Sequence, residues 1–205
     1  MKWLILKFKK IIILSIILFQ SFDCTHEDKR SDDFQYLIFD VNTNLLSTQR
    51  STINNKLELK MPRDYSKIDD DKFLIVKKTI ESDSTAFFNM ALLDVFNSPN
   101  GSYSVISKIV SDKNVFEEVD STYYALLAEI FKTKNIIKGK VRVNGIDVIQ
   151  HIISTNDKVM IKLILNVENS FYQIDYIIPL EYYEKELRSI ESSIGSIFEI
   201  KEDKQ

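Results

Sequence analysis

The chain has 205 residues, with 27 Lys and Arg, 30 Asp and Glu, two His and one Cys. This length is ample for one hydrophobic core and short for two, and a single cysteine excludes an internal disulfide. Only four glycines are present, so the glycine-rich loops that cradle nucleotide cofactors are not expected, and the sequence predicts no cofactor.

The amino-terminal segment has the layout of a secretory signal. Four lysines precede the apolar run from Ile11 to Phe19. That run is shorter than the about 20 apolar residues needed to cross a bilayer, but it is typical of the hydrophobic region of a signal peptide. We therefore expect residues 1–23 to be a signal peptide and the protein to be exported.

The only cysteine, Cys24, lies five residues after this run. Its position resembles that of the lipidated cysteine in bacterial lipoproteins, although Ser21 stands where leucine is usual and Asp23 where a small residue is usual. The resemblance implies an exported cell-envelope lipoprotein that contacts the membrane through an anchor on Cys24. The alternative is an unpaired thiol behind an ordinary cleaved signal.

Residues 24–33 are predicted to be a flexible tether, because they are polar and charged without an apolar period. Removal of residues 1–23 takes away four lysines and Asp23, which leaves 23 basic and 29 acidic residues and a net charge of −6. This balance argues against nucleic acid and anionic lipid surfaces as partners of the folded part. A single domain is expected over residues 34–205.

The first half of this domain is predicted to be rich in strands. Residues 34–41 fit either a strand or a short helix, and Leu57–Met61 alternates as a short strand that Pro62 ends. Residues 63–71 are expected to be a loop in which the run Asp69–Asp71 forms a solvated turn. A calcium site there is disfavoured, because alternate ligands and a hinge glycine are missing.

Further strands are predicted over 73–80 and 85–95, with a helix as the rival for the second. Asn97–Gly101 is a turn cluster, and 103–110 fits a strand or a poorly formed helix. A helix is expected over 121–135, because Asp120 or Ser121 can cap it and its apolar residues recur at helical spacing. Those apolar residues are Tyr124, Leu127, Ala128 and Phe131.

The second half alternates more clearly. Val141–Val143 and Ile146–Ser154 are predicted to be hairpin partners across an Asn-Gly turn. Lys158–Val167 is aliphatic at every odd position, which indicates a strand with one face in the core and the other partly wet. A short link leads to a further strand over 172–178.

A carboxyl-terminal helix is predicted over 180–198, with Pro179 in its first turn. Its apolar stripe is expected to pack on the sheet, with the charged side, Glu186 included, turned to solvent. The stripe consists of Tyr183, Leu187, Ile190, Ile194 and Ile197.

This order of elements resembles the PsbP/Mog1-like α/β sandwich. The resemblance rests on Leu59–Tyr65, on Gly145 between two strands, on Phe171–Ile174 and on the closing segment from Tyr182 to Ile197. It implies an α+β fold, an α/β/α sandwich in which helices flank an antiparallel sheet of about six or seven strands. It also implies an accessory or binding module without known catalysis.

No catalytic or metal-binding motif accompanies this pattern. His26 falls in the tether, and Asp147, the nearest acidic residue in sequence to His151, would lie about 13 Å from it along the same strand, too far for a dyad. The sequence therefore predicts no metal site, and for His151 the ordinary interpretation is a hydrogen-bonded strand residue.

Among the aromatic residues, Tyr123, Tyr172 and Tyr182 are candidates for an interaction surface, with the rim of the core as the alternative. The functional hypothesis is a membrane-tethered, non-catalytic accessory or binding module for a protein or envelope component. The alternative is an exported hydrolase-like enzyme with a site around His151 that sequence does not reveal.

Overall fold

The computed structural model describes residues 34–82, 89–110, 115–131 and 135–200. The predicted signal peptide, Cys24 and the tether lie outside these residues. Eight strands form the main sheet in the order β1-β7-β8-β9-β10-β6-β5-β4, and all neighbours are antiparallel except β1 and β7. The strands are β1 (Gln35–Tyr36), β4 (Ser66–Lys67), β5 (Asn89–Asn97), β6 (Tyr103–Val110), β7 (Ile136–Val143), β8 (Ile146–Ser154), β9 (Lys158–Val167) and β10 (Ser170–Pro179).

Strands β7 to β10 form the predicted meander, and two-residue turns set their register. Asn144 and Gly145 have φ values of 50° and 86°, and Glu168 and Asn169 have 47° and 59°. Positive φ at both central residues gives the turn twist that suits adjacent antiparallel strands. Both predicted hairpins are confirmed.

Both faces of the central strands are covered. On β9 the odd residues from Ile161 to Val167 enter one core cluster, and Met160 and Ile164 enter a second cluster on the opposite face. On this second face only Lys158, Lys162 and Asn166 keep partial exposure, so the expected partly wet face is limited to these three residues. The side chain of Lys162 is 13% exposed and pairs with Asp175.

Helix α4 (Tyr183–Gly195) and a small sheet cover the first face. The small sheet has the order β11-β3-β2, with β2 at Ser51–Ile53, β3 at Leu57–Leu59 and β11 at Phe198–Glu199. The predicted stripe is confirmed, with Ile190, Ile194 and Ile197 buried. The helix begins later than expected, because Pro179 is the last residue of β10 and pairs with Lys158. It ends earlier, at Gly195, because Phe198 pairs with Glu58 of β3.

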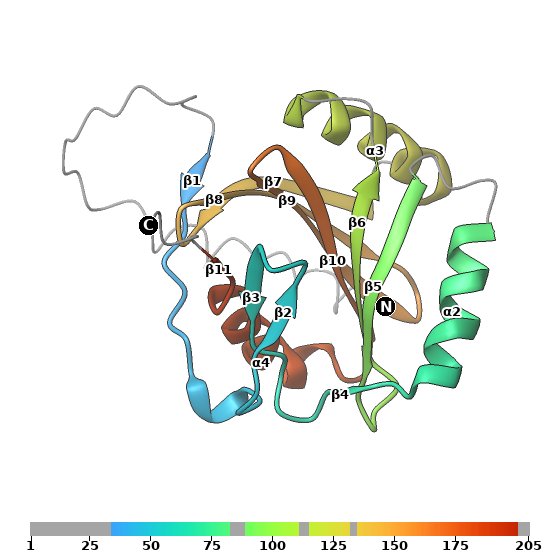
Figure 1. Ribbon diagram of the computed structural model, residues 1–205, viewed down its shortest axis with the longest axis vertical. Helices are drawn as coiled ribbons and strands as arrows, with labels where there is room; N and C mark the ends of the chain where they lie inside the picture. Colours follow the sequence, from blue (N-terminus) through green and yellow to red (C-terminus); the bar gives the residue numbers. More distant parts are fainter. Residues whose placement is uncertain (1–33, 83–88, 111–114, 132–134, 201–205) are drawn as a thin grey trace, which may run out of the picture. The chain divides into compact units, whose positions relative to one another are not determined.

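Helix α3 (Phe116–Phe131) covers the second face and lies across the sheet from α4 (Figure 1). It begins five residues earlier than predicted. Asp120 is buried inside it rather than capping it, because the buried stripe is Phe116, Val119, Tyr123 and Leu127. The three layers confirm the α/β/α arrangement.

A third helix, α2 (Asp70–Ser82), replaces the strand predicted over 73–80 and contacts β5 (Figure 1). Asp69 caps its start by accepting from the backbone N–H of Lys72 at 2.9 Å, so the aspartates begin a helix rather than form a solvated turn. Leu74 and Ile75 remain exposed. Its apolar face is thus incomplete, which hid the helical period.

Other segments are settled as follows. The strands predicted over 85–95 and 103–110 are confirmed by β5 and β6 for the described residues, while residues 85–88 lie outside them. The turn Asn97–Gly101 is confirmed too, and the Gly101 N–H donates to the carbonyl of Ser98. Residues 34–41 contain only the two-residue β1, and η1 (Thr43–Leu45) follows.

The main sheet has eight strands where six or seven were expected, because β1 and β4 are too short to show a period. No helix among the described residues is long and apolar enough to span a membrane.

Candidate functional site

The side chain of Glu186 is buried, although the helical pattern predicts it on the solvent side of the helix. Glu186 is only 8% exposed. It accepts hydrogen bonds from the Tyr65 hydroxyl at 2.9 Å, the Ser102 hydroxyl at 3.0 Å and the Asn100 amide at 3.3 Å. Three separate segments of the chain therefore meet on one carboxylate.

A buried carboxylate is tolerated here for two reasons. Glu186 lies in the first turn of α4, where the helix dipole favours negative charge. Its three donors replace the hydrogen bonds that water would make. Burial and the neighbouring charge of Glu186 together raise the pKa of Tyr65 well above its usual value, so the phenol stays protonated as a donor.

A hollow of about 300 Å³ opens beside this carboxylate, and we call it the α4 hollow. Its walls come from η1, the turn after β3, the β5–β6 turn and the first two turns of α4. The lining residues are Asn44, Leu45, Pro62, Arg63, Asp64, Tyr65, Ser98, Asn100, Lys185, Glu186 and Ser189. A neighbouring hollow of about 560 Å³ shares Arg63 and Tyr65 with it.

The two hollows differ in whether their cations form ion pairs within the protein. In the neighbouring hollow, Arg50 pairs with Glu58 at 2.6 Å and Lys67 pairs with Asp94. In the α4 hollow, neither Arg63 nor Lys185 has an ion-pair partner among the described residues. Arg63 lines both hollows and is thus a cation available to a ligand. We call its position between the hollows the ridge.

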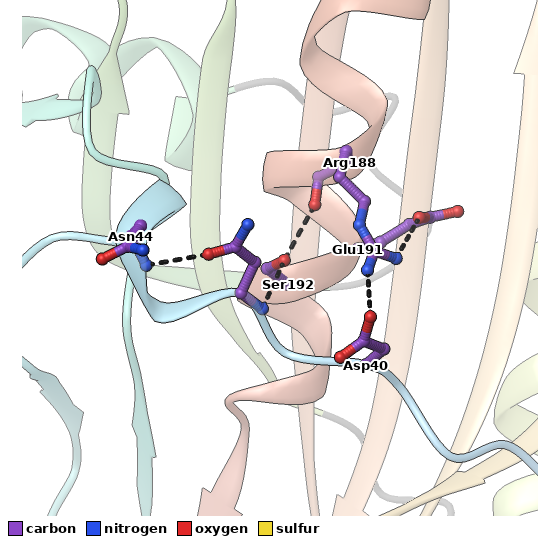
Figure 2. Close-up of polar contacts among 6 residues, drawn as sticks. Asp40, Asn44, Arg188, Glu191 and Ser192 are labelled. Atoms are coloured by element: carbon purple, nitrogen blue, oxygen red, sulfur yellow. Dashed lines mark hydrogen bonds and ion pairs between the residues drawn. The ribbon is translucent and has the colours of Figure 1, made fainter.

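One wall of the α4 hollow is held to the helix by the contacts in Figure 2. The backbone N–H of Asn42 donates to the Ser192 hydroxyl at 3.2 Å, and that hydroxyl donates to the carbonyl of Arg188. The Arg188 guanidinium also pairs with Asp40 at 2.5 Å. Because the segment before η1 is fastened along α4, the hollow is formed in the free protein.

The same segment crosses α4 closely at Gly195. A Cβ at this position would overlap the side chains of Phe39 and Val41. Only glycine permits this approach of segment and helix. On the opposite side, the Asn144 side chain donates to the carbonyls of Gly195 and Ile197, both at 2.8 Å, and so fixes the end of α4.

A second polar group lies beneath α3. Lys138, His151, Lys162 and Asp175 are direct cross-strand neighbours on β7, β8, β9 and β10. We call them the charged row. Lys162 pairs with Asp175 at 2.7 Å, and Lys138 pairs with Asp120 of α3. Charges rarely cross a core in this way unless they are paired.

His151 has a carboxylate neighbour, but from α3 rather than from its own strand. Its Nε2 lies 3.2 Å from Oδ1 of Asp120, although the geometry is not that of a hydrogen bond. Asp147, the residue considered from sequence, pairs with Arg142. His151 is fully buried and the Asp120 side chain is 4% exposed, so neither meets a molecule in solution.

The electrostatics of Asp120 follow from these neighbours. Burial alone would raise the pKa of its carboxyl, but the close imidazole of His151 and the hydrogen bond and charge of Lys138 outweigh burial and lower that pKa. Asp120 therefore remains ionised at neutral pH. Among the described residues, no three His, Cys, Asp or Glu side chains gather closely enough to hold a metal ion.

The structure does not bring the three candidate tyrosines together. Tyr123 lies in the cluster beneath α3, where burial raises its pKa to about 12. Tyr172 is buried in the cluster on the α4 face, and Tyr182 is half-buried against the same cluster. Sequence reasoning missed Arg63 and Glu186, and the only signal near them was the segment Leu59–Tyr65.

Comparisons with known proteins give information on the fold. No family model matches the chain, and no curated protein sequence matches it. A solution structure of cyanobacterial PsbP (CyanoP) from Synechocystis sp. PCC 6803 is similar with a TM-score of 0.50 at 12% identity, covering 74% of this chain and 91% of that chain.

A crystal structure of a protein from Bacteroides thetaiotaomicron VPI-5482 has a TM-score of 0.41 at 9% identity, and the match covers 77% of this chain and 50% of that chain. At these identities a likeness concerns architecture only. The match to the cyanobacterial structure agrees with the resemblance found in the order of elements, and the chain therefore has a PsbP-like α+β fold.

Proposed function

We propose that this protein is a non-catalytic accessory module of the cell envelope. It is exported, held at a membrane through a lipid on Cys24, and binds a protein or another envelope component through the α4 hollow. The tether between Cys24 and Phe34 gives the domain reach to meet a partner near the membrane surface.

The observation that carries the proposal is the contrast between the open and the buried polar groups. The α4 hollow is preformed and offers Arg63 and Lys185 without intramolecular ion pairs. A rigid hollow with available charges costs little ordering entropy on binding. By contrast, the Asp120–His151 pair, on which a hydrolase would rely, is sealed beneath α3. This burial disfavours the enzyme alternative.

The proposal is tested by crosslinking in intact cells. A photoreactive amino acid at Asn44 or Ser189, which line the hollow, is expected to give an adduct of discrete mass. The same amino acid at Glu129, exposed on α3, is the matched control and should give none. Equal adducts from all positions, or none from the hollow, would contradict the proposed binding surface.

The same cells test the anchor. Cys24→Ala should move the protein from the membrane fraction to the soluble fraction and leave its thermal unfolding unchanged, because acyl chains supply the membrane affinity. Labelled fatty acid should be incorporated into the original chain and not into the variant. A protein that stays in the membrane fraction after the substitution, or never incorporates label, is not anchored in this way.

A further inference from the structure

The charges of the α4 hollow identify the chemistry of its ligand. We infer that the hollow binds one carboxylate of an acidic segment of a partner, with Arg63 as the main contact and Lys185 as the second. This inference rests on the proposed function and specifies the partner group that the hollow takes.

Arg63 is presented by a turn that cannot easily move. The N–H of Tyr65 bonds the carbonyl of Pro62 at 3.0 Å, and the N–H of Arg63 bonds the carbonyl of Leu45 at 2.8 Å. The turn is fixed further by the Tyr65 hydroxyl on Glu186. The exposed guanidinium therefore projects from a rigid base, and its planar fork matches a carboxylate with two parallel hydrogen bonds.

The charges that line the hollow favour a monoanion. Arg63 and Lys185 are its two cations, and Asp64 and Glu186 are its two carboxylates. Glu186 keeps its charge but is held by three donors, so among the described residues neither cation pairs with a carboxylate and both can meet one carboxylate of a ligand. A dianionic phosphate would bring a second charge close to Asp64 and Glu186, where like charges repel.

The shape of the hollow indicates an extended segment rather than a free small acid. Its volume of about 300 Å³ is at the lower limit of small-molecule sites. Leu45 and Pro62 add apolar contact, and the neighbouring hollow continues the depression beyond Arg63. One acidic side chain fits at the ridge while the adjoining backbone lies along the two hollows.

The test is a titration of the full chain in detergent micelles, followed through the backbone amide signals of residues 63–65 and 185. The probes are a capped pentapeptide with a central glutamate, the same peptide with glutamine, and inorganic phosphate. The glutamate peptide should shift these signals with a millimolar dissociation constant, on the order expected for one charged anchor. The glutamine peptide and phosphate should bind at least about fivefold more weakly.

Three variants sharpen the result. Arg63→Gln should weaken binding of the glutamate peptide about tenfold, because a charged hydrogen-bonding fork is lost. Arg142→Gln is the matched control and should change little, since Arg142 lines neither hollow and already pairs with Asp147. Asp64→Asn should strengthen binding, because it removes one of the two carboxylates of the hollow. Unchanged melting temperatures establish that each variant is folded.

Equal binding of the glutamate and glutamine peptides, tighter binding of phosphate, or shifts confined to other residues would each overturn the inference. A different result would contradict the proposed function. If Asn44 still crosslinks to a partner in cells when Arg63→Gln is present, the hollow binds a partner but not through a carboxylate. If Asn44 gives no crosslink in the original chain, the proposed function itself is wrong.

Discussion

The two faces of the main sheet are held by different forces. The α4 face is closed by aliphatic burial, and the polar groups at its centre are neutral hydroxyls, while the Glu186 carboxylate lies at its margin beside the α4 hollow. Ser193 donates to the carbonyl of Lys60 at 2.6 Å and lies 2.8 Å from the Tyr176 hydroxyl. The α3 face has the charged row through its middle. One face thus depends on shape, and the other depends on charges remaining paired.

This difference also separates binding from structure. The polar groups of the α4 face that remain available lie at its margin, in the α4 hollow. Those of the α3 face lie at the centre, beneath the helix, where they serve folding alone. His151, which looks reactive in the sequence, is therefore buried in the fold, while the unremarkable Arg63 lies in the proposed binding surface.

The largest expected effect is the loss of Asp175 from the charged row. Burial alone would lower the pKa of the Lys162 ammonium, but the charge of Asp175 beside it raises that pKa. Asp175→Ala leaves this buried cation unpaired and should reduce the free energy of unfolding by about 3 to 5 kcal/mol. Urea denaturation at neutral pH measures the change.

The double variant Lys162→Met with Asp175→Leu is the informative control. Replacing a buried pair by apolar groups of similar size removes the unpaired charge, so most of the stability should return. Gln173 loses the carboxylate that it contacts at 2.9 and 2.8 Å, so the recovery should be incomplete. If the double variant is as unstable as the single one, the row is not held by charge pairing.

On the α4 face, truncation of a side chain should destabilise the protein in proportion to its burial, as in an aliphatic core. Ile190→Ala should cost about 2 to 4 kcal/mol, because the side chain is fully buried and leaves a cavity. Leu187→Ala on the same stripe should cost less, because Leu187 is half-buried. Thermal unfolding of the two variants provides the measurement. A larger loss for Leu187 would mean that α4 packs on the sheet differently.

Much of the fold was predictable because its signals are local. The alternation of Lys158–Val167 and the positive-φ turn at Asn144 fix strand and register within a few residues. Helix α2 was missed because its sequence carries no clear amphipathic face, and two of its aliphatic side chains remain in solvent. Only the aspartates at its start indicated a helix, and they were interpreted as a turn.

The candidate site was not predictable, because its parts come from distant segments. Tyr65 and Glu186 are 121 residues apart in the chain, and a helical pattern places Glu186 among its charged neighbours. The partner of His151 was missed for the same reason. Distance along one strand excluded Asp147, while Asp120 approaches from a helix packed over the strand. Sequence periodicity describes single elements and contains no information on which elements meet.

The smallest expected effect is an acid sensitivity confined to the α3 face. The folded pKa of Asp120 is lowered by His151 and Lys138, so at acid pH the unfolded chain binds this proton more readily than the folded chain does. Its contribution to stability is present above the usual aspartate pKa of about 3.9 and is lost as pH falls through the folded value. Asp120→Asn should therefore cost about 1 kcal/mol at pH 5 and progressively less toward pH 3.

The measurement is the urea midpoint of the original chain and of Asp120→Asn between pH 5 and pH 3, where the two curves should converge. Asp40→Asn is the control on the α4 face, since Asp40 pairs with Arg188 at an exposed position and solvent screens that pair. Its midpoint should differ little from the original at any of these pH values. If the Asp120 curve instead stays parallel to the original down to pH 3, the carboxylate is not stabilised by charge, and the α3 face is held by the same apolar packing as the α4 face.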